Sequence, residues 1–355
     1  MTLDLQTLAR IEELRIPLED PASPVDWKDW YHFVLLDRAS GVRSLVNITL
    51  AGRPNRGEIQ VTFIVNANPE GILSPVPPNT ALLTFGTAYS LEWKPSAVRR
   101  SPLRVQGRGM CLEINGSQAE VAVRDERSQL SIHFQAQARA TPLLVTEDSP
   151  FGSGFIGWGL VPGVQVAGEL CVGDRRFELD ANWFCYHDRN FGRFRWGEDI
   201  GWEWFVASAQ CENNRELTFV LDWRTNKDHS QGGLPYIFVY VERELCKIFL
   251  GSSLQIDWGW TETSVLPTRL PGVMASVFSD RTLRMPQSLQ VEAVDELDSL
   301  SMTVEFDGTS ELIVPDNQDR QYTFIAEVTG PIQVRLCLQG ETLVANGLVY
   351  AEYVQ

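Results

Sequence analysis

From residue 27 to the C-terminus, the chain is a succession of short apolar runs separated by turn residues. The runs are rich in Val, Ile, Phe, Tyr and Trp, and most are followed by Gly, Asn, Asp or Pro. Clear examples are WYHFVLLD (30–37), RSLVNITL (43–50) and EIQVTFIVN (58–66). β-Branched and aromatic residues favour strands, and many short strands with frequent turns are typical of antiparallel sandwiches and barrels. The sequence therefore predicts an all-β protein.

One short N-terminal helix is the expected exception. Leu3, Leu8, Ile11 and Leu14 recur close to the spacing of one helical face. The first residues lack the basic segment and long apolar core of a signal peptide, so none is expected. No apolar run reaches the roughly 20 residues of a membrane-spanning helix. We therefore expect a cytoplasmic protein without stable membrane insertion.

The length of the chain favours two domains. With 355 residues and 44% hydrophobic content, it exceeds the usual size of one domain and can bury two cores. The polar stretch RTNKDHSQGGLP (224–235) contains Gly-Gly and has no hydrophobic periodicity. We predict the boundary there, with an N-terminal domain at 1–228 and a C-terminal domain at 229–355. The alternative is that 224–235 is a long hairpin loop within one domain.

Charge and motifs argue against several functions. The net charge of −16 disfavours a nucleic-acid partner, which requires a basic face, and docking on anionic lipid. The sequence has no dinucleotide-binding fingerprint, phosphate-binding loop or nucleophile elbow. The four histidines are dispersed and lack the HxH or HExxH spacing of zinc ligands. We expect no metal and no organic cofactor.

The most unusual segment is NWFCYHDRNFGRFRWGEDIGWEWF (182–205). More than a third of its residues are aromatic, against 10% for the whole chain, and acids lie among the rings. If the chain is extended here, its side chains alternate between two faces. Tyr186, Asp188 and Asn190 then share one face, and His187 lies on the other.

An acid among aromatic rings has a chemical use. Burial disfavours the charged form of a carboxyl, so Asp188 can stay protonated near neutral pH and donate its proton to an alkene. Aromatic faces then stabilise the positive charge that develops on the substrate. The alternative is structural: the rings form a core, and the acid pairs with Arg189, Arg193 or Arg195.

The octapeptide at 185–192 resembles the fingerprint of the carotenoid 1,2-hydratase (hydroxyneurosporene synthase) family and its relatives, the tocopherol cyclases and the AttH-like proteins. That fingerprint reads roughly Gly-Tyr-x-Asp-His-Asn-Trp-Gly, followed by a Trp-rich strand. The matching positions are Tyr186, Asp188, Asn190 and Gly192. The positions that differ are Cys185, Arg189 and Phe191.

Two further matches extend the resemblance along the chain. Residues 27–50 are similar to the opening hairpin of this superfamily, which fungal lipocalin-like Diels–Alderases share. The closing ANGLVYAEYVQ (345–355) is similar to its last strand, with Glu352 at the position of a family Glu. The resemblance implies two lipocalin-like antiparallel β-barrel or sandwich domains with a hydrophobic cavity at or near their interface.

The resemblance also implies a cofactor-independent hydratase or cyclase that acts on a hydrophobic polyene, such as a terpenoid, carotenoid or polyketide. Asp188 is the expected general acid, oriented by Tyr186 and Asn190. The candidate catalytic residues are Tyr186, His187, Asp188 and Asn190. The candidate substrate-binding residues are Trp30, Tyr31, His32, Trp202, Trp204, Asp222, Trp223 and Glu352.

Two other functions fit the same pattern. One is a pericyclase of the Diels–Alderase type, in which the cavity folds a polyene into a reactive shape. There Tyr186 or His32 would donate a hydrogen bond to a carbonyl of the substrate. The other is a non-catalytic, lipocalin-like binder of a hydrophobic small molecule.

Overall fold

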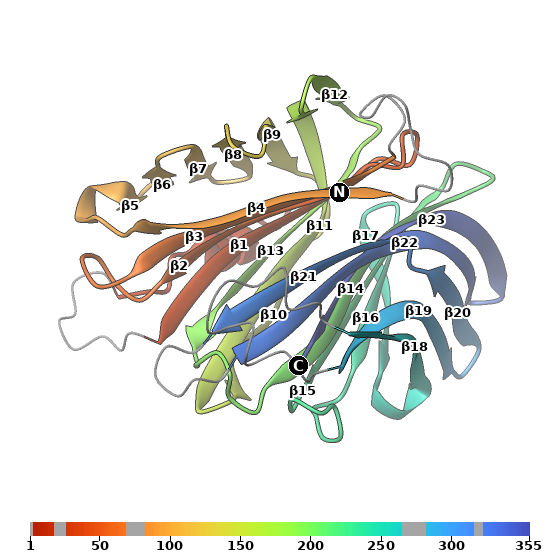
Figure 1. The fold of residues 1–355 in the computed structure, drawn as a ribbon. Coiled ribbons are helices and arrows are strands. Elements are labelled where there is room, and N and C mark those ends of the chain that lie inside the picture. Colours follow the sequence, from red (N-terminus) through yellow and green to blue (C-terminus); the bar gives the residue numbers. More distant parts are fainter. Residues whose placement is uncertain (1–2, 18–25, 69–81, 265–281, 316–321) are drawn as a thin grey trace.

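The computed structural model describes residues 3–17, 26–68, 82–264, 282–315 and 322–355. Most of it is strand, in two curled antiparallel sheets that lie against each other (Figure 1). One short helix, α1 (Leu5–Glu12), precedes them. The prediction of an all-β protein with two lipocalin-like halves and a short N-terminal helix is confirmed.

The first sheet is built from the N-terminal half of the chain. Its strands are β1 (Trp27–Leu36), β2 (Arg43–Ala51), β3 (Glu58–Ala67), β4 (Leu83–Glu92), β5 (Val98–Arg100), β6 (Leu103–Gly107), β7 (Met110–Asn115), β8 (Gln118–Asp125), β9 (Leu130–Ala138), β10 (Leu143–Phe151), β11 (Gly154–Val172), β12 (Arg175–Leu179) and β13 (Phe184–Arg193). Their order across the sheet is β4-β3-β2-β1-β13-β11-β9-β8-β7-β6-β5, and β10 and β12 also pair with β11. A 3-10 turn, η1 (Pro95–Ala97), precedes β5.

The second sheet follows from the rest of the chain. Its strands are β14 (Gly201–Cys211), β15 (Glu216–Thr225), β16 (Tyr236–Val241), β17 (Glu244–Leu250), β18 (Leu254–Ser264), β19 (Thr282–Asp295), β20 (Asp298–Glu305), β21 (Gly308–Pro315), β22 (Tyr322–Leu338) and β23 (Glu341–Val354). Their order is β17-β16-β15-β14-β23-β22-β20-β19-β18, and β21 pairs with β22. A second 3-10 turn, η2 (Gly251–Ser253), precedes β18.

The strands that face the other sheet are covered on both sides. In β1 every residue after Trp27 is buried, and β13 is almost as closed. One face of these strands packs into the core of their own curled sheet, and the other packs against the second sheet. Strand β4, at the edge, instead alternates between half-buried and exposed residues, as a strand with one covered face does.

Three apolar layers hold the molecule together. One fills the curve of the first sheet and one the curve of the second. The third lies between the sheets, and its fully or nearly fully buried members are Val34, Leu36, Leu45, Ile64, Trp158, Leu160, Phe184, Tyr186, Trp204, Val206, Val220, Phe238, Tyr240, Leu348 and Tyr350. We call this third layer the inter-sheet layer.

The chain passes from the first sheet to the second between Arg193 and Gly201, inside the aromatic segment. The stretch 224–235, favoured by the sequence as a domain boundary, joins β15 to β16, which are neighbours in the second sheet. It therefore corresponds to the hairpin alternative, and a division at 228/229 does not match the division between the sheets. The polarity of this stretch reflects a loop at the surface, where its backbone can be solvated.

Helix α1 packs onto the first sheet. Asp4 caps it by accepting hydrogen bonds from the backbone N–H groups of Gln6 and Thr7. The helix buries Leu8 and Ile11. A Cβ atom on Gly159 of β11 would lie 2.6 Å from Ile11 Cγ1, so glycine at this position lets the helix approach the sheet.

A buried ion pair fixes the chain around this helix. Arg189 and Asp29 have no exposed surface, and Arg189 Nη2 donates to Asp29 Oδ1. Arg189 Nη1 also donates to Ile11 O at 3.2 Å, and its guanidinium lies 3.6 Å from the centre of the Tyr31 ring. The other Asp29 oxygen accepts from Arg15 N at 2.8 Å. Arg189 therefore has a structural role that connects α1, β1 and β13.

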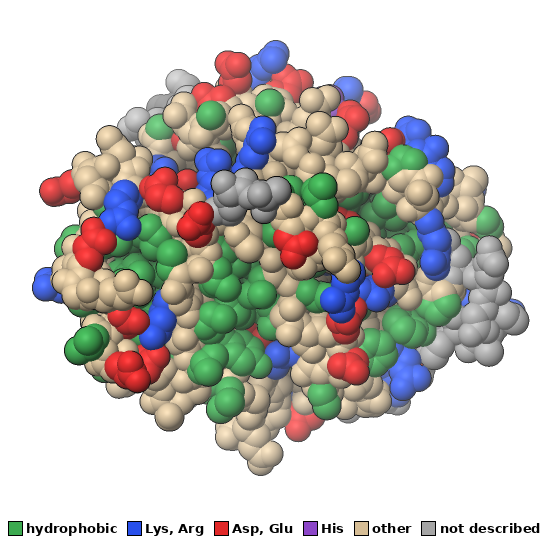
Figure 2. Space-filling view, turned by 180° about the vertical axis from the view of Figure 1, so that it is seen from behind, with side chains coloured by type: hydrophobic (Ala, Val, Ile, Leu, Met, Phe, Trp, Pro, Cys, Tyr) green, Lys and Arg blue, Asp and Glu red, His purple; other side chains and the backbone are tan. Residues whose placement is uncertain are grey.

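The surface gives no sign of a large charged binding face in the view of Figure 2. Lys and Arg side chains are interspersed there with Asp and Glu and form no continuous basic patch. The absence of a nucleic-acid partner stays a prediction. Among the described residues, no helix has both the length and the apolar character needed to cross a membrane.

Arg189→Met should lower the free energy of unfolding by about 3–5 kcal/mol, because it leaves the Asp29 carboxylate buried without its ion-pair partner. Adding Asp29→Asn should restore part of the loss, since no unpaired charge then remains. Arg193→Met is the matched control, because Arg193 is exposed at the end of the same strand. Urea unfolding followed by tryptophan fluorescence measures all three. A single Arg189→Met variant as stable as the parent would contradict this role.

Candidate functional site

A pocket of about 50 Å³ lies between the two sheets, beside the inter-sheet layer. β1, β10, β11 and β13 line it from the first sheet, and β14, β15 and β23 from the second. The lining residues are Trp30, His32, Phe151, Ile156, Trp158, Asp188, Asn190, Trp202, Trp204, Asp222, Arg224 and Glu352. Asn190, Trp202 and Arg224 are partly exposed, so the pocket meets solvent on their side.

Strand pairing explains why these residues meet. In the first sheet β13 lies between β1 and β11, which places His32 directly opposite Asp188 and places Asn190 between Trp30 and Trp158. In the second sheet Trp204 of β14 lies between Asp222 of β15 and Glu352 of β23. Residues directly opposite each other on paired strands point to the same face. Each sheet therefore presents a row of aromatic and polar side chains to the other.

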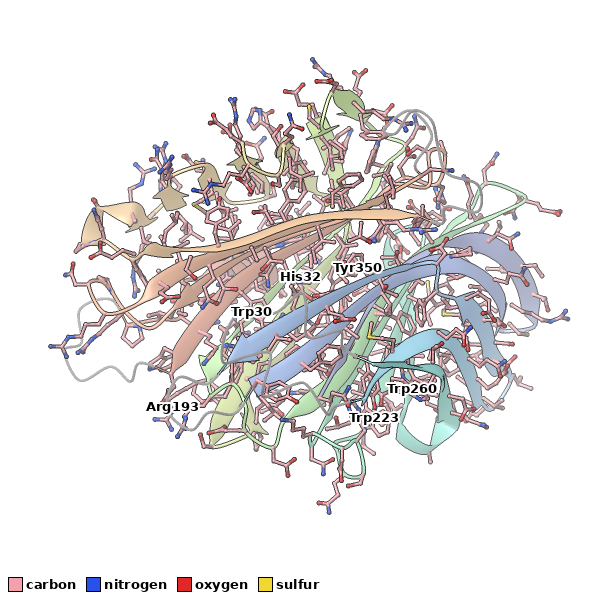
Figure 3. The ribbon with its side chains drawn as sticks, viewed as in Figure 1. Trp30, His32, Arg193, Trp223, Trp260 and Tyr350 are labelled. Atoms are coloured by element: carbon pink, nitrogen blue, oxygen red, sulfur yellow. The ribbon has the colours of Figure 1, made fainter. Side chains whose placement is uncertain are left out.

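The structure brings together most of the residues selected from the sequence. Those that line the pocket are Trp30, His32, Asp188, Asn190, Trp202, Trp204, Asp222 and Glu352. Trp30 and His32 lie where the two sheets meet, whereas Trp223 lies away from them, within the second half of the molecule (Figure 3). Tyr186 lies in the inter-sheet layer and contacts the pocket through its hydrogen bond to Asp188.

Besides Tyr186, three selected residues do not line the pocket, because alternation turns them to the opposite face. Tyr31 packs in the core of the first sheet under Arg189. His187 stacks on Phe33 with ring centres 4.1 Å apart, and its ring nitrogens lie 3.0 Å from His32 O and 3.1 Å from Glu12 Oε1.

Trp223 is the third of them. Its Nε1 donates to Gly233 O at 3.0 Å, on the far side of β15. His187 and Trp223 therefore stabilise the two halves of the molecule rather than form the pocket.

Four lining residues were not selected from the sequence: Phe151, Ile156, Trp158 and Arg224. Trp158 lies in the run GFIGWGLV, which reads as an ordinary strand. Its position follows from the pairing of β11 with β13, which no local pattern predicts. Arg224 lies at the start of the polar stretch 224–235, and the alternation of β15 places it on the face of Asp222.

Three hydrogen bonds hold the Asp188 carboxyl, which is 2% exposed. Its Oδ2 accepts from Tyr186 Oη at 2.8 Å and from Trp158 Nε1 at 3.1 Å, and its Oδ1 accepts from Asn190 Nδ2 at 3.1 Å. A carboxylate oxygen has two acceptor sites, so both sites of Oδ2 are filled and one site of Oδ1 remains. When Asp188 is protonated, its proton therefore lies on Oδ1.

Burial raises the pKa of Asp188 to about 6. The hydrogen bonds from Trp158 and Tyr186 lower that pKa, because they stabilise the carboxylate, but they do not offset the loss of solvent. The charge of Asp222 raises it further. Asp188 thus exchanges a proton within reach of neutral pH, as a general acid must.

Glu352 provides a second carboxyl on the facing sheet. Its Oε2 accepts from Trp202 Nε1 at 2.8 Å, and its Oε1 lies 3.8 Å from His32 Nδ1. Burial raises the pKa of Glu352 to about 7, and the charge of Asp188 adds to the rise. Burial lowers the pKa of His32 to about 3, so His32 is neutral and forms no ion pair with Glu352.

Asp222 and Arg224 form the third charged group of the pocket. Arg224 Nε lies 3.1 Å from Asp222 Oδ2, and Arg224 Nη2 donates to Tyr236 Oη at 3.3 Å. Burial raises the pKa of Asp222 to about 6, and the Arg224 charge opposes that rise.

The buried lining atoms without a hydrogen-bond partner include three nitrogens: His32 Nε2, Trp204 Nε1 and Arg224 Nη1. Buried polar atoms nearly always have partners. Trp204 Nε1 and Arg224 Nη1 can only donate. The pocket is therefore suited to a ligand that carries an oxygen acceptor as well as apolar surface.

No cluster of three or more His, Cys, Asp or Glu side chains suited to a metal ion occurs in the part of the chain that the structure describes. The carboxyls of the pocket are instead held by indole, phenol, amide and guanidinium donors. That no metal or organic cofactor is required stays a prediction.

No protein-family model matches the chain, and no curated protein matches it significantly. Solved structures match it almost end to end. A candidate AttH protein from Nitrosomonas europaea has a TM-score of 0.59 at 13% identity, with 97% of this chain and 98% of that chain covered. Kievitone hydratase from Nectria haematococca has a TM-score of 0.56 at 11% identity, with 96% and 94% covered. CghA with Sch210972 has a TM-score of 0.57 at 10% identity, with 99% and 97% covered.

At these identities the similarity shows a shared fold. The resemblance to the AttH-like group that the sequence indicates is therefore confirmed for the fold.

Asp188→Asn should stabilise the protein at high pH relative to low pH. The pKa of Asp188 is about 6 in the folded protein and near its ordinary value of 3.8 in the unfolded chain. As the pH rises, the Asp188 carboxyl therefore keeps its proton to higher pH in the folded protein than in the unfolded chain. Asp188 thus makes the unfolding free energy fall as the pH rises from about 4 to about 6. A pKa difference of about two units between the folded and unfolded states corresponds to about 3 kcal/mol. Relative to the parent, the unfolding free energy of Asp188→Asn should therefore be about that much higher at pH 8 than at pH 4.

Urea unfolding at the two pH values measures this shift. Asp174→Asn, in the exposed turn between β11 and β12, is the matched control and should leave the pH dependence unchanged. A pH-independent difference between Asp188→Asn and the parent would show that Asp188 does not carry a raised pKa.

Proposed function

We propose that this protein is an acid-dependent hydratase or cyclase that acts on an unsaturated, largely hydrophobic small molecule bound between its two sheets. Asp188 is the proton donor. The observation that carries the proposal is the environment of its carboxyl, which is almost fully buried in the pocket wall, has one open site on Oδ1 and titrates near pH 6.

The lining supports a reaction that develops positive charge. Trp30, Trp158, Trp202 and Trp204 border the pocket. Their ring faces carry partial negative charge and attract a cation. A proton added to one carbon of an alkene leaves positive charge on the other carbon, which these rings and the newly formed Asp188 carboxylate stabilise.

The size of the pocket limits what it accepts. A volume of about 50 Å³ has room for only a few water molecules. The reacting end of a longer molecule would fill it, and the remainder would extend past the partly exposed Asn190, Trp202 and Arg224. His32, Trp204 and Arg224 offer buried atoms for an oxygen of that ligand.

The fold comparisons support this class of function without identifying the substrate. One of the similar structures is a hydratase by name, and another was solved with the small molecule Sch210972. A polyene of terpenoid, carotenoid or polyketide origin is the substrate class that the sequence resemblance implies.

A pericyclase is the second candidate, and one observation favours it. Tyr186 already donates to Asp188, so of the two donors considered from the sequence only His32 is free to bind a substrate carbonyl. His32 Nε2 is buried, lines the pocket through its side chain and has no partner. Such catalysis would depend on the shape of the pocket and would not need the Asp188 proton.

Turnover in deuterium oxide separates these candidates. A panel of polyenes and prenylated phenols is incubated with the protein, and the products are analysed by mass spectrometry and NMR. A protonation mechanism places one solvent deuteron on carbon, and hydration also adds one solvent oxygen. A pericyclic product contains no carbon-bound deuterium. A product formed without carbon-bound deuterium would contradict the proposed function.

Asp188→Asn should reduce such turnover by on the order of 10²- to 10⁴-fold, because it removes the donated proton but retains the size of the side chain. The parent enzyme should lose activity about tenfold per pH unit above a midpoint near 6, where Asp188 ionises. Steady-state kinetics from pH 5 to pH 8 measures both effects.

Tyr186→Phe is the matched variant for this assignment. It removes one donor to Asp188 Oδ2, so the pKa of Asp188 should rise by roughly one unit. The decline in activity should move to higher pH by the same amount. A pH profile that stays fixed in Tyr186→Phe would rule out Asp188 as the group that controls it.

A further inference from the structure

A second buried glutamate lies directly beside Glu352. Glu327 of β22 is opposite Glu352 of β23 in the register of the two strands. Residues opposite each other in an antiparallel pair point to the same face, and their Cα atoms are about 4.5–5.5 Å apart. Glu352 faces the first sheet, as its contacts with Trp202 and His32 show. Glu327 therefore faces it too, and it is 4% exposed.

In the part of the chain that the structure describes, no cation neutralises these two side chains. Neither glutamate forms an ion pair with Lys or Arg among the described residues. Arg43 of the first sheet forms two hydrogen bonds with Asp307, at 2.5 and 3.1 Å. Arg224 lies beside Asp222 on β15. His32 is neutral.

The other titratable groups that face the pair from the described residues are acidic. Asp188 lies across the pocket, and Asp222 lies on the same sheet as the pair, beyond Trp204. Tyr350 lies two residues before Glu352 on the same face of β23, where the sheets meet (Figure 3). None of them offers a positive charge. Two adjacent carboxyl groups that are buried without a cation repel each other when both are ionised, so one of them keeps its proton.

The surroundings favour Glu327 as the group that keeps a proton. Glu327 Oε2 is buried without a hydrogen-bond partner, and the Tyr350 hydroxyl lowers the pKa of Glu327 less than burial and the charge of Glu352 raise it. Glu352 Oε2, in contrast, accepts from Trp202. A donor stabilises a carboxylate, so the negative charge belongs on Glu352. Burial, together with the charge of Glu352, raises the pKa of Glu327 well above its usual range.

We propose that Glu327 stays protonated and donates its proton as a hydrogen bond to Glu352, so that Glu352 is the base of the pocket. Glu327 does not line the pocket, and its role is to position and tune Glu352. A buried carboxylic acid that is kept neutral in order to donate a hydrogen bond is a known device of active sites. The role of Glu352 in a reaction rests on the proposed function, but the protonation of Glu327 does not.

The pair completes a balanced hydration. The Asp188 Oδ1–H bond breaks as its proton forms a C–H bond with the alkene, which leaves a carbocation and the Asp188 carboxylate. A water oxygen forms a C–O bond with the cation, and the extra proton of that water passes to the Glu352 carboxylate. The substrate has then gained one water, and solvent exchange returns a proton from Glu352 to Asp188. In a cyclisation, Glu352 would instead accept a proton from carbon.

Two measurements on the ligand-free protein test the inference. Infrared spectra of protein labelled with ¹³C-glutamate detect the carbonyl band of a protonated glutamic acid and separate it from aspartic acids. The indole N–H resonance of Trp202, assigned with Trp202→Phe, reports the ionisation of Glu352 through their hydrogen bond. Both are followed from pH 5 to pH 9.

The parent should retain one protonated glutamate band above pH 8, and Glu327→Gln should lose it. The pH midpoint of the Trp202 indole N–H resonance should stay unchanged in Glu327→Gln, because the amide of Gln also donates to Glu352. It should rise by about one unit or more in Glu327→Leu, which has no donor. Glu311→Gln, at an exposed position on β21, is the matched control and should change neither signal.

Two results would overturn the proposal. One is the absence of a protonated glutamate band above pH 8 in the parent. The other is a Trp202 midpoint that falls in Glu327→Gln, since that shows that an ionised Glu327 was removed. Neither measurement uses a substrate. Failure here therefore leaves the Asp188 tests standing, and failure of those tests leaves this result standing.

Discussion

The packing of the two curled sheets, outer face against outer face, is the constraint on which the rest of the molecule depends. It leaves β1, β13, β14 and the second half of β23, from Leu348 to Val354, almost without a face toward solvent. Any polar side chain on the faces of these strands that meet between the sheets loses its water and must be paired, protonated or hydrogen-bonded. The raised pKa values of Asp188, Asp222 and Glu352 all have burial as their largest cause. The chemistry of the pocket is thus a direct result of how the sheets meet.

The same constraint explains why acids occur in an aromatic segment. The chain crosses between the sheets at 194–200, and Phe194 and Ile200 pack there with Trp30, Phe151 and Ile156. The rings of the crossing therefore pack behind Trp30, Phe151 and Ile156, which line the pocket.

The acids of this segment have different environments and different roles. Glu198 Oε2 accepts from Ser153 N at 2.9 Å, and Asp199 Oδ1 accepts from Lys227 N at 2.9 Å. Glu203 accepts from Trp258 Nε1 at 2.7 Å on the other side of β14. Three of the acids therefore fix loops and strands, and only Asp188 reaches the pocket.

Alternation along one strand could be predicted from the sequence, and pairing between strands could not. It placed Tyr186, Asp188 and Asn190 on one face and His187 on the other, as the structure has them. His187, Tyr31 and Trp223 were selected for their residue type. Alternation along the strand places each of them on the face opposite to that of the residues before and after it in the chain. Trp158 and Glu327 come from strands far along the chain. Their contacts depend on long-range pairing, which the local pattern does not determine.

The charges of the pocket fit an uncharged ligand that becomes cationic only during the reaction. Asp188 and Glu352 can share one proton in two forms, and the reactive form has Asp188 protonated and Glu352 ionised. With Asp222 beside Arg224, the pocket then carries one negative charge. Proton transfer from Asp188 places a positive charge on the ligand and a negative charge on Asp188, so the net charge does not change. Capture of the cation by water and transfer of a proton to Glu352 leave it unchanged again. In a site with little water, where each uncompensated charge is costly, the reaction therefore moves one proton between two carboxyls across the seam of the sheets.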